Sequence, residues 1–363
     1  MPEVEVEAGE TLIVSGPASI RLLAGEAQIL AAPLSLEDRV TIRRWRRLPI
    51  YCSKPSRVEV GLGSGGSINK VRGSTIPAEW WEASNRIIEA LEKTQLVAVV
   101  GGVDVGKTTF TVFLCNRALT SGLKVSVVDG DLGQSDIGPP CTVGSALLSR
   151  PVFDLFFVKP ERLVFVGSVT PAKVKGRLLE ALKELCGFER GRASLVVLNT
   201  DGWISGDGAE SFKVELVRSV EADWVVALQS AGELESILKG LEGLEGRVLR
   251  VPSSPAVRPR SRGERRELRW QAYNKYLAGA SILNLKLERL KISGGQPSPG
   301  CILGLYSLKP RRLLGIGVAL ACDQRRGTLK VLTSAKGSIG EIMVGEALPD
   351  FTVKPRPELS QRP

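Results

Sequence analysis

The chain has 363 residues, enough for two or three domains, and its 43% hydrophobic and 24% charged residues are typical of a globular protein. No apolar run approaches the roughly 20 residues of a membrane span. The acidic start MPEVEVEAGE is unlike a secretory signal, so we expect a cytoplasmic protein with no membrane partner. The absence of histidine excludes mechanisms that need a histidine base or metal ligand, and the net charge of +10 favours a polyanionic partner, nucleic acid above all.

Residues 1–78 are predicted to form an N-terminal β domain. Short alternating apolar runs, such as Thr11–Val14 and Val58–Val60, are broken by glycine and proline, as in a small antiparallel sandwich or barrel. The sequence Ser74-Thr75-Ile76-Pro77 then leads into a predicted helix around Trp81–Lys93.

From Gln95 onward, strands and helices are predicted to alternate, as in a doubly wound α/β core. The strand candidates are near-continuous apolar runs, which favour buried parallel strands. They are Leu96–Val100, Val125–Val128, Arg162–Val166, Leu195–Leu198 and Trp224–Leu228. Between them, Ala172–Cys186 places apolar side chains at helical spacing.

A basic helix, Arg262–Leu277, follows a proline-rich stretch, and β alternation returns after Leu283. The predicted domains are therefore the N-terminal β domain at 1–78, a core with an arginine-rich lid at 79–284, a C-terminal β domain at 285–353 and a loose tail at 354–363.

One glycine-rich loop carries a specific chemical signature. It fits G-x-x-x-x-G-K-[ST] and lies between the buried strand Leu96–Val100 and the predicted helix Thr109–Leu119, the context expected of a nucleoside-triphosphate site. Its N–H groups would bind phosphate, the lysine would reach the β- and γ-phosphates, and the threonine would bind Mg²⁺. The loop residues are Gly101, Gly102, Val103, Asp104, Val105, Gly106, Lys107 and Thr108, with Thr109 opening the helix. The predicted fold class is thus α/β, with a P-loop NTPase parallel-sheet core flanked by small β domains.

A pair of aspartates ends the next strand. Asp129 and Asp131 are two residues apart and would emerge on the same side of an extended strand. One would serve the Mg²⁺ shell, and the other would accept the proton of an attacking hydroxyl, since no histidine is present. The alternative is that both only decorate a turn.

Two further features favour a nucleic-acid substrate. The sequence Asn199-Thr200-Asp201-Gly202-Trp203 follows a buried strand, and Trp203 either stacks on an unpaired base or belongs to the core. The second feature is the dense arginine run from Arg258 to Arg269, which either clamps the γ-phosphate or holds a nucleic-acid backbone. The earlier run Arg43–Arg47 either extends a basic groove or lies on a solvated β edge.

These motifs, in this order, resemble those of the polynucleotide 5′-hydroxyl kinases. That family includes the RNA-kinase subunit of the eukaryotic messenger-RNA cleavage factor and archaeal homologues, and the compact length and amide-poor composition of this chain favour an archaeal member. The resemblance is carried by Gly101–Thr108, the D-x-D-x-G-Q element Asp129–Gln134, the T-x-G-W element Thr200–Trp203 and the arginine-rich lid. It implies transfer of the γ-phosphate of ATP (or GTP) to a 5′-hydroxyl end of RNA or DNA with Mg²⁺, and protein partners in RNA processing.

The resemblance also implies roles for single residues. Lys107 holds the triphosphate, Thr108 and Asp129 serve Mg²⁺, and Asp131 is the base. Gln134, Thr200 and Trp203 seat the terminal nucleotides. Arg262 and Arg266 are the expected catalytic arginines, with Arg258, Arg260 and Arg265 competing for that role. Two other functions stay open: a nucleotide-binding scaffold without turnover, and a kinase for a small nucleoside or metabolite.

Overall fold

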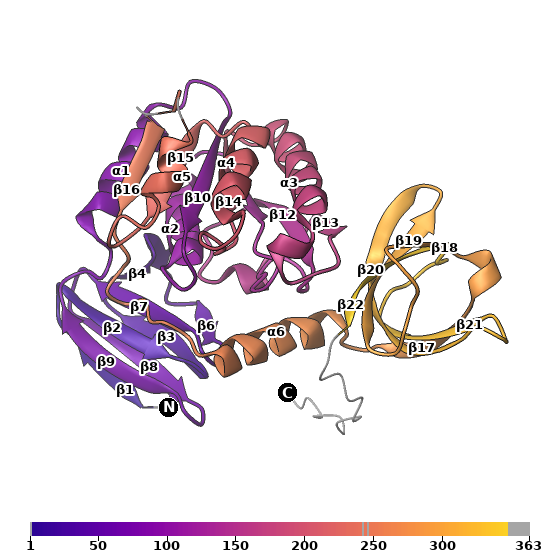
Figure 1. Cartoon of the computed structure of the whole chain (residues 1–363). Coiled ribbons are helices and arrows are strands. Elements are labelled where there is room, and N and C mark those ends of the chain that lie inside the picture. The colour runs from indigo at the N-terminus through magenta and orange to yellow at the C-terminus, as the bar shows by residue number, and fades with distance from the viewer. Residues whose placement is uncertain (1, 242, 245–246, 348–363) are drawn as a thin grey trace. The chain divides into compact units, whose positions relative to one another are not determined.

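The computed structural model describes residues 2–241, 243–244 and 247–347 (Figure 1). The chain divides into two compact units, one from Met1 to Lys275 and another that begins at Tyr276. The predicted tail 354–363 and positions 348–353 of the predicted C-terminal domain lie outside the described residues. Across the ranges that are described, no helix is both long enough and apolar enough to cross a bilayer.

The first unit begins with a sandwich of two antiparallel sheets, in the strand orders β1-β8-β3-β6 and β5-β4-β7-β2-β9. Alternation places every second side chain between the sheets; Leu12 and Val14, for example, are fully buried. The strands are β1 (Glu3–Val6), β2 (Glu10–Ser15), β3 (Ala18–Ala24), β4 (Ala27–Ile29), β5 (Ala32–Leu34), β6 (Arg39–Ile42), β7 (Arg47–Cys52), β8 (Ser56–Leu62) and β9 (Ser67–Arg72).

A seven-stranded sheet in the order β13-β12-β11-β14-β10-β15-β16 forms the centre of the first unit. The five strands from β11 to β16 in this order are parallel, whereas β12 and β13 are antiparallel to their neighbours. The strands are β10 (Gln95–Gly101), β11 (Val125–Asp129), β12 (Thr142–Leu148), β13 (Arg162–Phe165), β14 (Leu195–Asn199), β15 (Trp224–Leu228) and β16 (Val248–Val251).

The prediction of a buried parallel strand at Arg162–Val166 is wrong. This segment forms β13, an antiparallel edge strand whose first residue, Arg162, is exposed. The chain between β12 and β13 contains only one 3₁₀ turn, Leu155–Phe157, and a short connection without a crossover helix returns the chain antiparallel.

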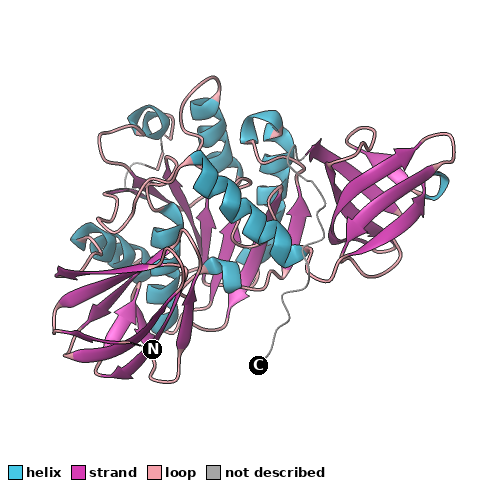
Figure 2. Ribbon diagram, turned by 90° about the horizontal axis from the view of Figure 1, so that it is seen from below, coloured by secondary structure: helices cyan, strands magenta, loops and turns pink. Residues whose placement is uncertain are grey.

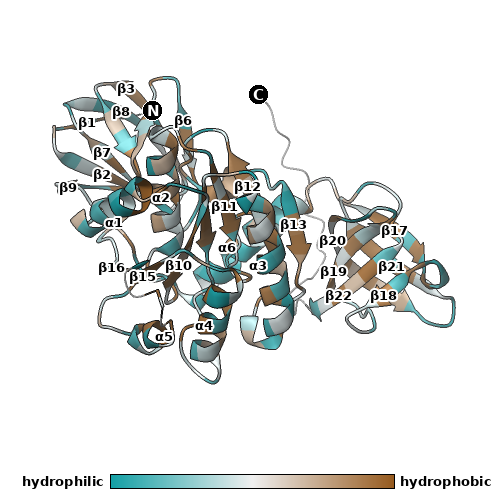
Figure 3. Cartoon of the chain, turned by 90° about the horizontal axis from the view of Figure 1, so that it is seen from above, coloured by the Kyte–Doolittle hydropathy of each residue, from teal (hydrophilic) through white to brown (hydrophobic). Residues whose placement is uncertain are grey.

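Helices cover both faces of the sheet (Figure 2). Successive residues of β10 point into two different cores: Val97 and Val99 pack on the side of α1 and α2, and Ala98 packs on the side of α3 and α4. Figure 3 shows hydrophobic strands between helices with hydrophilic outer faces. The helices of the first unit are α1 (Ala78–Glu89), α2 (Lys107–Thr120), α3 (Lys175–Arg190), α4 (Ala209–Ser219), α5 (Glu235–Lys239) and α6 (Arg262–Tyr276), which runs one residue into the second unit.

The second unit is a small β structure. Its six strands lie in the order β17-β21-β20-β19-β22-β18, and all neighbours are antiparallel except β18 and β22. β17 crosses the predicted boundary between residues 284 and 285. The strands are β17 (Ser281–Lys286), β18 (Lys291–Ser293), β19 (Cys301–Leu308), β20 (Arg311–Asp323), β21 (Thr328–Thr333) and β22 (Glu341–Ala347). The predicted fold class, a parallel-sheet α/β core with small β parts before and after it in sequence, is confirmed.

Candidate functional site

The glycine-rich loop lies between β10 and α2, at the edge of the sheet where the parallel strands end. Gly106 has a φ of 100°, and a Cβ atom there would lie 2.9 Å from Val257 Cγ2, so the tight turn requires glycine. The N-terminus of α2 has no side-chain cap. Its first N–H groups are therefore available to bind an anion such as phosphate.

A pocket of about 520 Å³ opens above this loop. Gly101, Gly102 and Val105 do not line the pocket, and a Cβ on Gly101 would lie 2.8 Å from Val105 Cγ2, so this position requires glycine. The loop residues that line it are Val103, Asp104, Gly106, Lys107, Thr108 and Thr109.

Lys107 is the cation at the base of the pocket. Its Nζ donates a hydrogen bond of 2.6 Å to the Gly102 carbonyl oxygen. Burial lowers the pKa of the Lys107 ammonium to about 8, although the nearby Asp131 carboxylate opposes this shift. The Lys107 ammonium therefore loses its proton as the pH rises through about 8, well below the usual range of a lysine.

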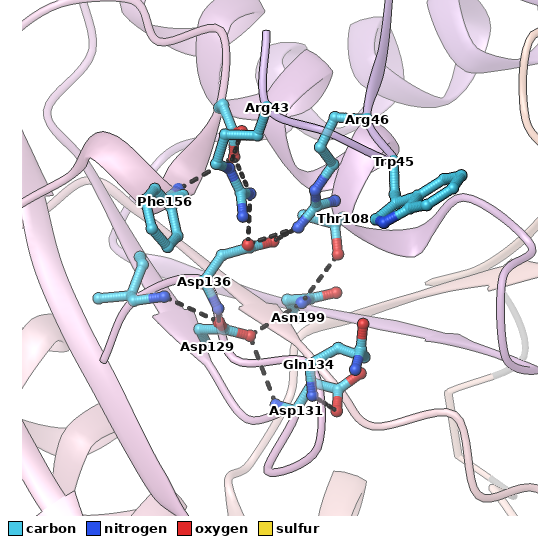
Figure 4. Close-up of polar contacts among 12 residues, drawn as sticks. Arg43, Trp45, Arg46, Thr108, Asp129, Asp131, Gln134, Asp136, Phe156 and Asn199 are labelled. Carbon is cyan, nitrogen blue, oxygen red and sulfur yellow. Dashed lines mark hydrogen bonds and ion pairs between the residues drawn. The ribbon is translucent and has the colours of Figure 1, made fainter. Parts of the chain in front are cut away.

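Asp129 ends β11, is fully buried and does not line the pocket; Figure 4 shows its polar contacts. Its Oδ2 accepts the backbone N–H of Asp136 at 2.6 Å, and its Oδ1 accepts Asn199 Nδ2 at 2.9 Å. Asn199 Nδ2 also lies 3.4 Å from Thr108 Oγ1. Burial, with the charges of Asp136 and Asp131, raises the pKa of Asp129 to about 7. The link from Asp129 to Thr108 therefore passes through an asparagine.

Asp131 faces the pocket. Because β11 ends at Asp129, the chain turns there, and the two carboxylates do not share the side of a strand as predicted. Asp131 Oδ1 accepts the backbone N–H groups of Gly133 at 3.0 Å and Gln134 at 2.9 Å. Burial raises the pKa of Asp131, the Lys107 charge opposes that rise, and the Asp201 charge adds to it. A carboxyl with a raised pKa suits proton transfer.

The turn after β14 brings Trp203 to the pocket wall. Its backbone N–H donates to Asp201 Oδ1 at 2.8 Å, and its ring packs against Phe212, 5.6 Å between centroids. Trp203 therefore both contacts the core and lines the pocket. Thr200 differs from its prediction: it does not line the pocket, is fully buried, and donates its hydroxyl to the Val99 carbonyl oxygen at 2.8 Å.

Asp201 and Lys213 form a buried ion pair that no motif in the sequence predicts. Lys213 Nζ lies 2.9 Å from Asp201 Oδ2, and the side chains are 0% and 4% exposed. Asp201 also lines the pocket. A lysine 12 residues away inside an amphipathic helix carries no local signal of this contact.

The lid arginines that line the pocket are not the two predicted. The buried face of α6, marked by Leu268, carries Arg265 and Arg269 toward the pocket, whereas Arg262 and Arg266 are exposed and do not line it. One residue corresponds to about 100° of helix rotation, which moves a side chain to another face. Arg258 and Arg260 line the pocket from the segment before α6. Gln134, as predicted, lies at the pocket, and its Nε2 donates to the Arg265 carbonyl oxygen at 3.1 Å.

The N-terminal sandwich also contributes to this region through the β6–β7 turn. Trp45, Arg46 and Arg47 line the pocket. The Arg43 side chain, in contrast, is only 8% exposed and donates hydrogen bonds to Asp154 Oδ2 and Asp136 Oδ1, both at 2.9 Å. Arg46 also pairs with Asp136 (Figure 4). The run Arg43–Arg47 is thus neither a uniform basic groove nor a solvated edge.

A family model and individual relatives point to the same protein family. Residues 101–279 match the family model described as the mRNA cleavage and polyadenylation factor CLP1 P-loop. The chain is 34% identical over 219 residues to a polyribonucleotide 5′-hydroxyl-kinase of Methanocaldococcus jannaschii, covering 60% of each chain. It is 30% identical over 312 residues to the polyribonucleotide 5′-hydroxyl-kinase Clp1 of Bos taurus, covering 79% of this chain and 71% of that protein.

The fold is similar to that of Clp1p solved in complex with Pcf11p. The TM-score is 0.77 at 14% identity, covering 95% of this chain and 97% of that one. The match to the Methanocaldococcus jannaschii protein and the match to a polyribonucleotide 5′-hydroxyl-kinase of Pyrococcus furiosus each span 60% of the relative's length.

Proposed function

The chain belongs to the Clp1 family of polyribonucleotide 5′-hydroxyl-kinases, and on this premise we propose that it transfers the γ-phosphate of ATP or GTP to the 5′-hydroxyl end of RNA or DNA. The observation that carries the proposal is that Lys107 and Asp131 face one pocket, a phosphate-binding cation beside a carboxyl suited to accept a proton. Trp203 on the same wall offers a surface for a base.

The triphosphate would lie on the loop N–H groups and the first turn of α2. Lys107 would donate to its β- and γ-phosphate oxygens in place of the Gly102 carbonyl, and the anion would favour the charged form of the lysine. Because phosphoryl transfer depends mainly on positioning and charge stabilisation, this cradle would supply much of the catalysis.

The Thr108 hydroxyl and the neighbouring Asn199 amide and Asp129 carboxylate support a proposed magnesium site. Asn199 Oδ1 is a buried acceptor with no hydrogen-bond partner among the described residues, and its amide lies between Thr108 and Asp129. Hard oxygen donors of this kind, with retained waters, suit Mg²⁺ better than a dedicated protein cage. We propose that Thr108 holds Mg²⁺ directly and that Asp129 and Asn199 orient its shell. Bound there, Mg²⁺ would neutralise phosphate charge.

Asp131 would act on the substrate hydroxyl. Its Oδ1 is held by two backbone N–H groups, which fixes the carboxylate while Oδ2 is not used in those contacts. The proton of the 5′-hydroxyl would move to this carboxylate as the oxygen attacks, a role that no histidine can take in this sequence. Gln134 and Trp203 would seat the terminal nucleotide.

The arginines of the lid would stabilise the charge of the transferring phosphoryl group. Arg265 and Arg269 are the better candidates than Arg262 and Arg266, because the former pair lines the pocket. Protein partners in RNA processing are a further part of the proposal, supported by the solved complex of the similar Clp1p with Pcf11p.

One assay tests the proposal. The protein is incubated with γ-labelled ATP, Mg²⁺ and a 5′-hydroxyl RNA or DNA oligonucleotide, and label on the oligonucleotide is measured. Transfer that is lost in Lys107→Ala, in Asp131→Asn and after chelation of Mg²⁺ supports the kinase. A 5′-phosphorylated oligonucleotide is the control substrate. ATP binding without transfer would instead indicate a scaffold, and transfer only to free nucleosides would indicate a metabolite kinase.

A further inference from the structure

Asp104 places a negative charge inside a loop built to bind phosphates. It is the fourth residue of the loop, has a left-handed φ of 58°, and its side chain lines the pocket at 7% exposure. Like charges a few ångströms apart in a partly buried site repel by several kcal/mol at an effective dielectric of about 20. The carboxylate would therefore weaken triphosphate binding unless other groups compensate for its charge.

Two lid arginines compensate for it. Asp104 Oδ1 accepts Arg260 Nη1 at 2.9 Å, and Oδ2 accepts Arg265 Nη1 at 2.9 Å. The backbone N–H of Arg260 also donates to Oδ2 at 2.9 Å. The arginine side chains are only 21% and 27% exposed. A single carboxylate thus binds the segment before α6 and the first turn of α6 to the phosphate loop.

These contacts occupy one end of the Arg265 guanidinium. Its Nη1 serves Asp104 and also donates to the Arg260 carbonyl oxygen at 2.6 Å. The other donors of the planar fork, Nη2 and Nε, are not used in these contacts, and Arg265 lines the pocket. The Arg265 guanidinium is therefore anchored through Nη1, and its Nη2 and Nε remain as donors for a ligand in the pocket.

The positive charge of the pocket makes such an anchor for Arg260 and Arg265 important. Arg46, Arg258 and Arg269 line the same pocket. Burial, together with the Arg46 charge, lowers the pKa of Arg260, while Asp104 opposes that shift. Arg46 pairs with Asp136 and Arg258 pairs with Glu264, whereas Arg260 and Arg265 both pair with Asp104. Without the Asp104 carboxylate, these two guanidinium groups would repel each other across the pocket.

We propose that Asp104 is a positioning residue that keeps Arg260 and Arg265 folded over the phosphate pocket in the nucleotide-free protein and orients Arg265 toward the phosphoryl group being transferred. The catalytic part of this inference rests on the proposed kinase function, whereas the closed position of the arginines does not.

The decisive variant is Asp104→Asn. Asparagine has the same size and is favoured in the left-handed backbone region, so the variant removes the charge with little backbone strain. We expect kcat to fall about 10- to 100-fold, less than the roughly 100- to 1,000-fold fall on outright loss of one positioned donor, because Arg265 itself is still present. The KM for ATP should stay equal or fall, because a repelling charge is gone. Loss of a residue with only a structural role would not lower kcat while leaving the KM for ATP equal or lower.

A second measurement does not depend on activity. Trypsin cleaves after Arg260, and cleavage of a segment held in place requires local opening. In the nucleotide-free full chain, Asp104→Asn should increase the cleavage rate there at least fivefold. The matched control is Glu235→Gln, which also removes a carboxylate from an arginine pair, at the exposed Arg250, outside the pocket. The control should change neither cleavage nor kcat.

The double variant Asp104→Asn/Arg265→Gln checks the coupling. If Asp104 acts through Arg265, the double variant should be no slower than Arg265→Gln alone. If Asp104→Asn folds poorly, Arg265→Lys serves instead, since it keeps the ion pair and loses the fork, and the same fall in kcat is expected.

Three results would overturn the inference: unchanged or raised kcat in Asp104→Asn, a raised ATP KM with unchanged kcat, or equal cleavage rates in wild type and variant. If the wild-type protein transfers no phosphate, the kinase proposal fails, and the cleavage rates alone decide whether Asp104 holds the arginines.

Discussion

The buried pair of Lys213 and Asp201 gives the sharpest stability prediction. Lys213 Nζ contacts both the Asp201 carboxylate at 2.9 Å and the Asp201 carbonyl oxygen at 3.1 Å, with almost no exposure to solvent. Lys213→Met keeps the length of the side chain and leaves the carboxylate buried without its cation. Loss of one partner from a buried pair costs about 3–5 kcal/mol.

That cost is a large fraction of the roughly 5–15 kcal/mol that stabilise a typical domain. For a unit of this size it corresponds to a fall in Tm of roughly 6–20 °C. The double variant Lys213→Met/Asp201→Asn should recover most of the loss, because no charge then stays buried. Thermal unfolding followed by tryptophan fluorescence measures all three proteins.

The control is Lys54→Met, which removes the lysine of an exposed pair with Glu26, 63% and 58% exposed, and should cost less than about 1 kcal/mol. A Tm of Lys213→Met within 2 °C of wild type would refute the reasoning. So would a double variant as unstable as the single one, since that would assign the loss to packing and not to charge.

Three more predictions follow from the site. The affinity for ATP should weaken as the pH rises through about 8, because the charged form of Lys107 binds phosphate. Lys107→Arg stays charged, so calorimetric titrations of this variant between pH 7 and 9 should show no such dependence. Trp203→Ala should raise the KM for the oligonucleotide about 5- to 150-fold, the equivalent of one base stack, and leave the KM for ATP nearly unchanged; equal effects in steady-state kinetics would contradict stacking. Arg43 and Arg46 hold the pKa of Asp154 at about 2 although burial acts to raise it, so this carboxylate stabilises the fold above pH 4 and loses that effect between pH 4 and 2. The Tm difference between wild type and Arg43→Gln should therefore be largest near neutral pH and shrink below pH 4, and a difference independent of pH would exclude the charge interaction as its cause.

The features that could be predicted from sequence are those with a local signature. The loop ending in Lys107 and Thr108 needs its glycines, lysine and threonine at fixed spacing, and Asp131 and Trp203 follow buried strands that end at the same edge of the sheet. Each of these side chains was therefore predictable near the pocket without knowledge of distant contacts.

The remaining features depend on contacts between distant residues. Which arginines of α6 face the pocket depends on the rotation of the helix about its axis, and the prediction of Arg262 and Arg266 had the wrong rotation. The packing of Leu268 and the ion pair of Arg265 with Asp104, 161 positions away, set this rotation. The role of Thr200 was missed because its hydroxyl is used by the neighbouring strand. Neither contact leaves a pattern within a short stretch of sequence.

The ion pairs of Arg43 have a consequence for where the chain can be truncated or recombined with a relative. Its guanidinium comes from the N-terminal sandwich and neutralises Asp136 and Asp154 of the core, and the backbone N–H of Asp136 in turn binds the Asp129 carboxylate. A fragment starting at the first residue of α1 would lose Arg43 and Arg46, the two guanidinium partners of these carboxylates. The sandwich and the core therefore share one ion cluster, and recombination between relatives at this junction should succeed only when both sides of the cluster are exchanged together.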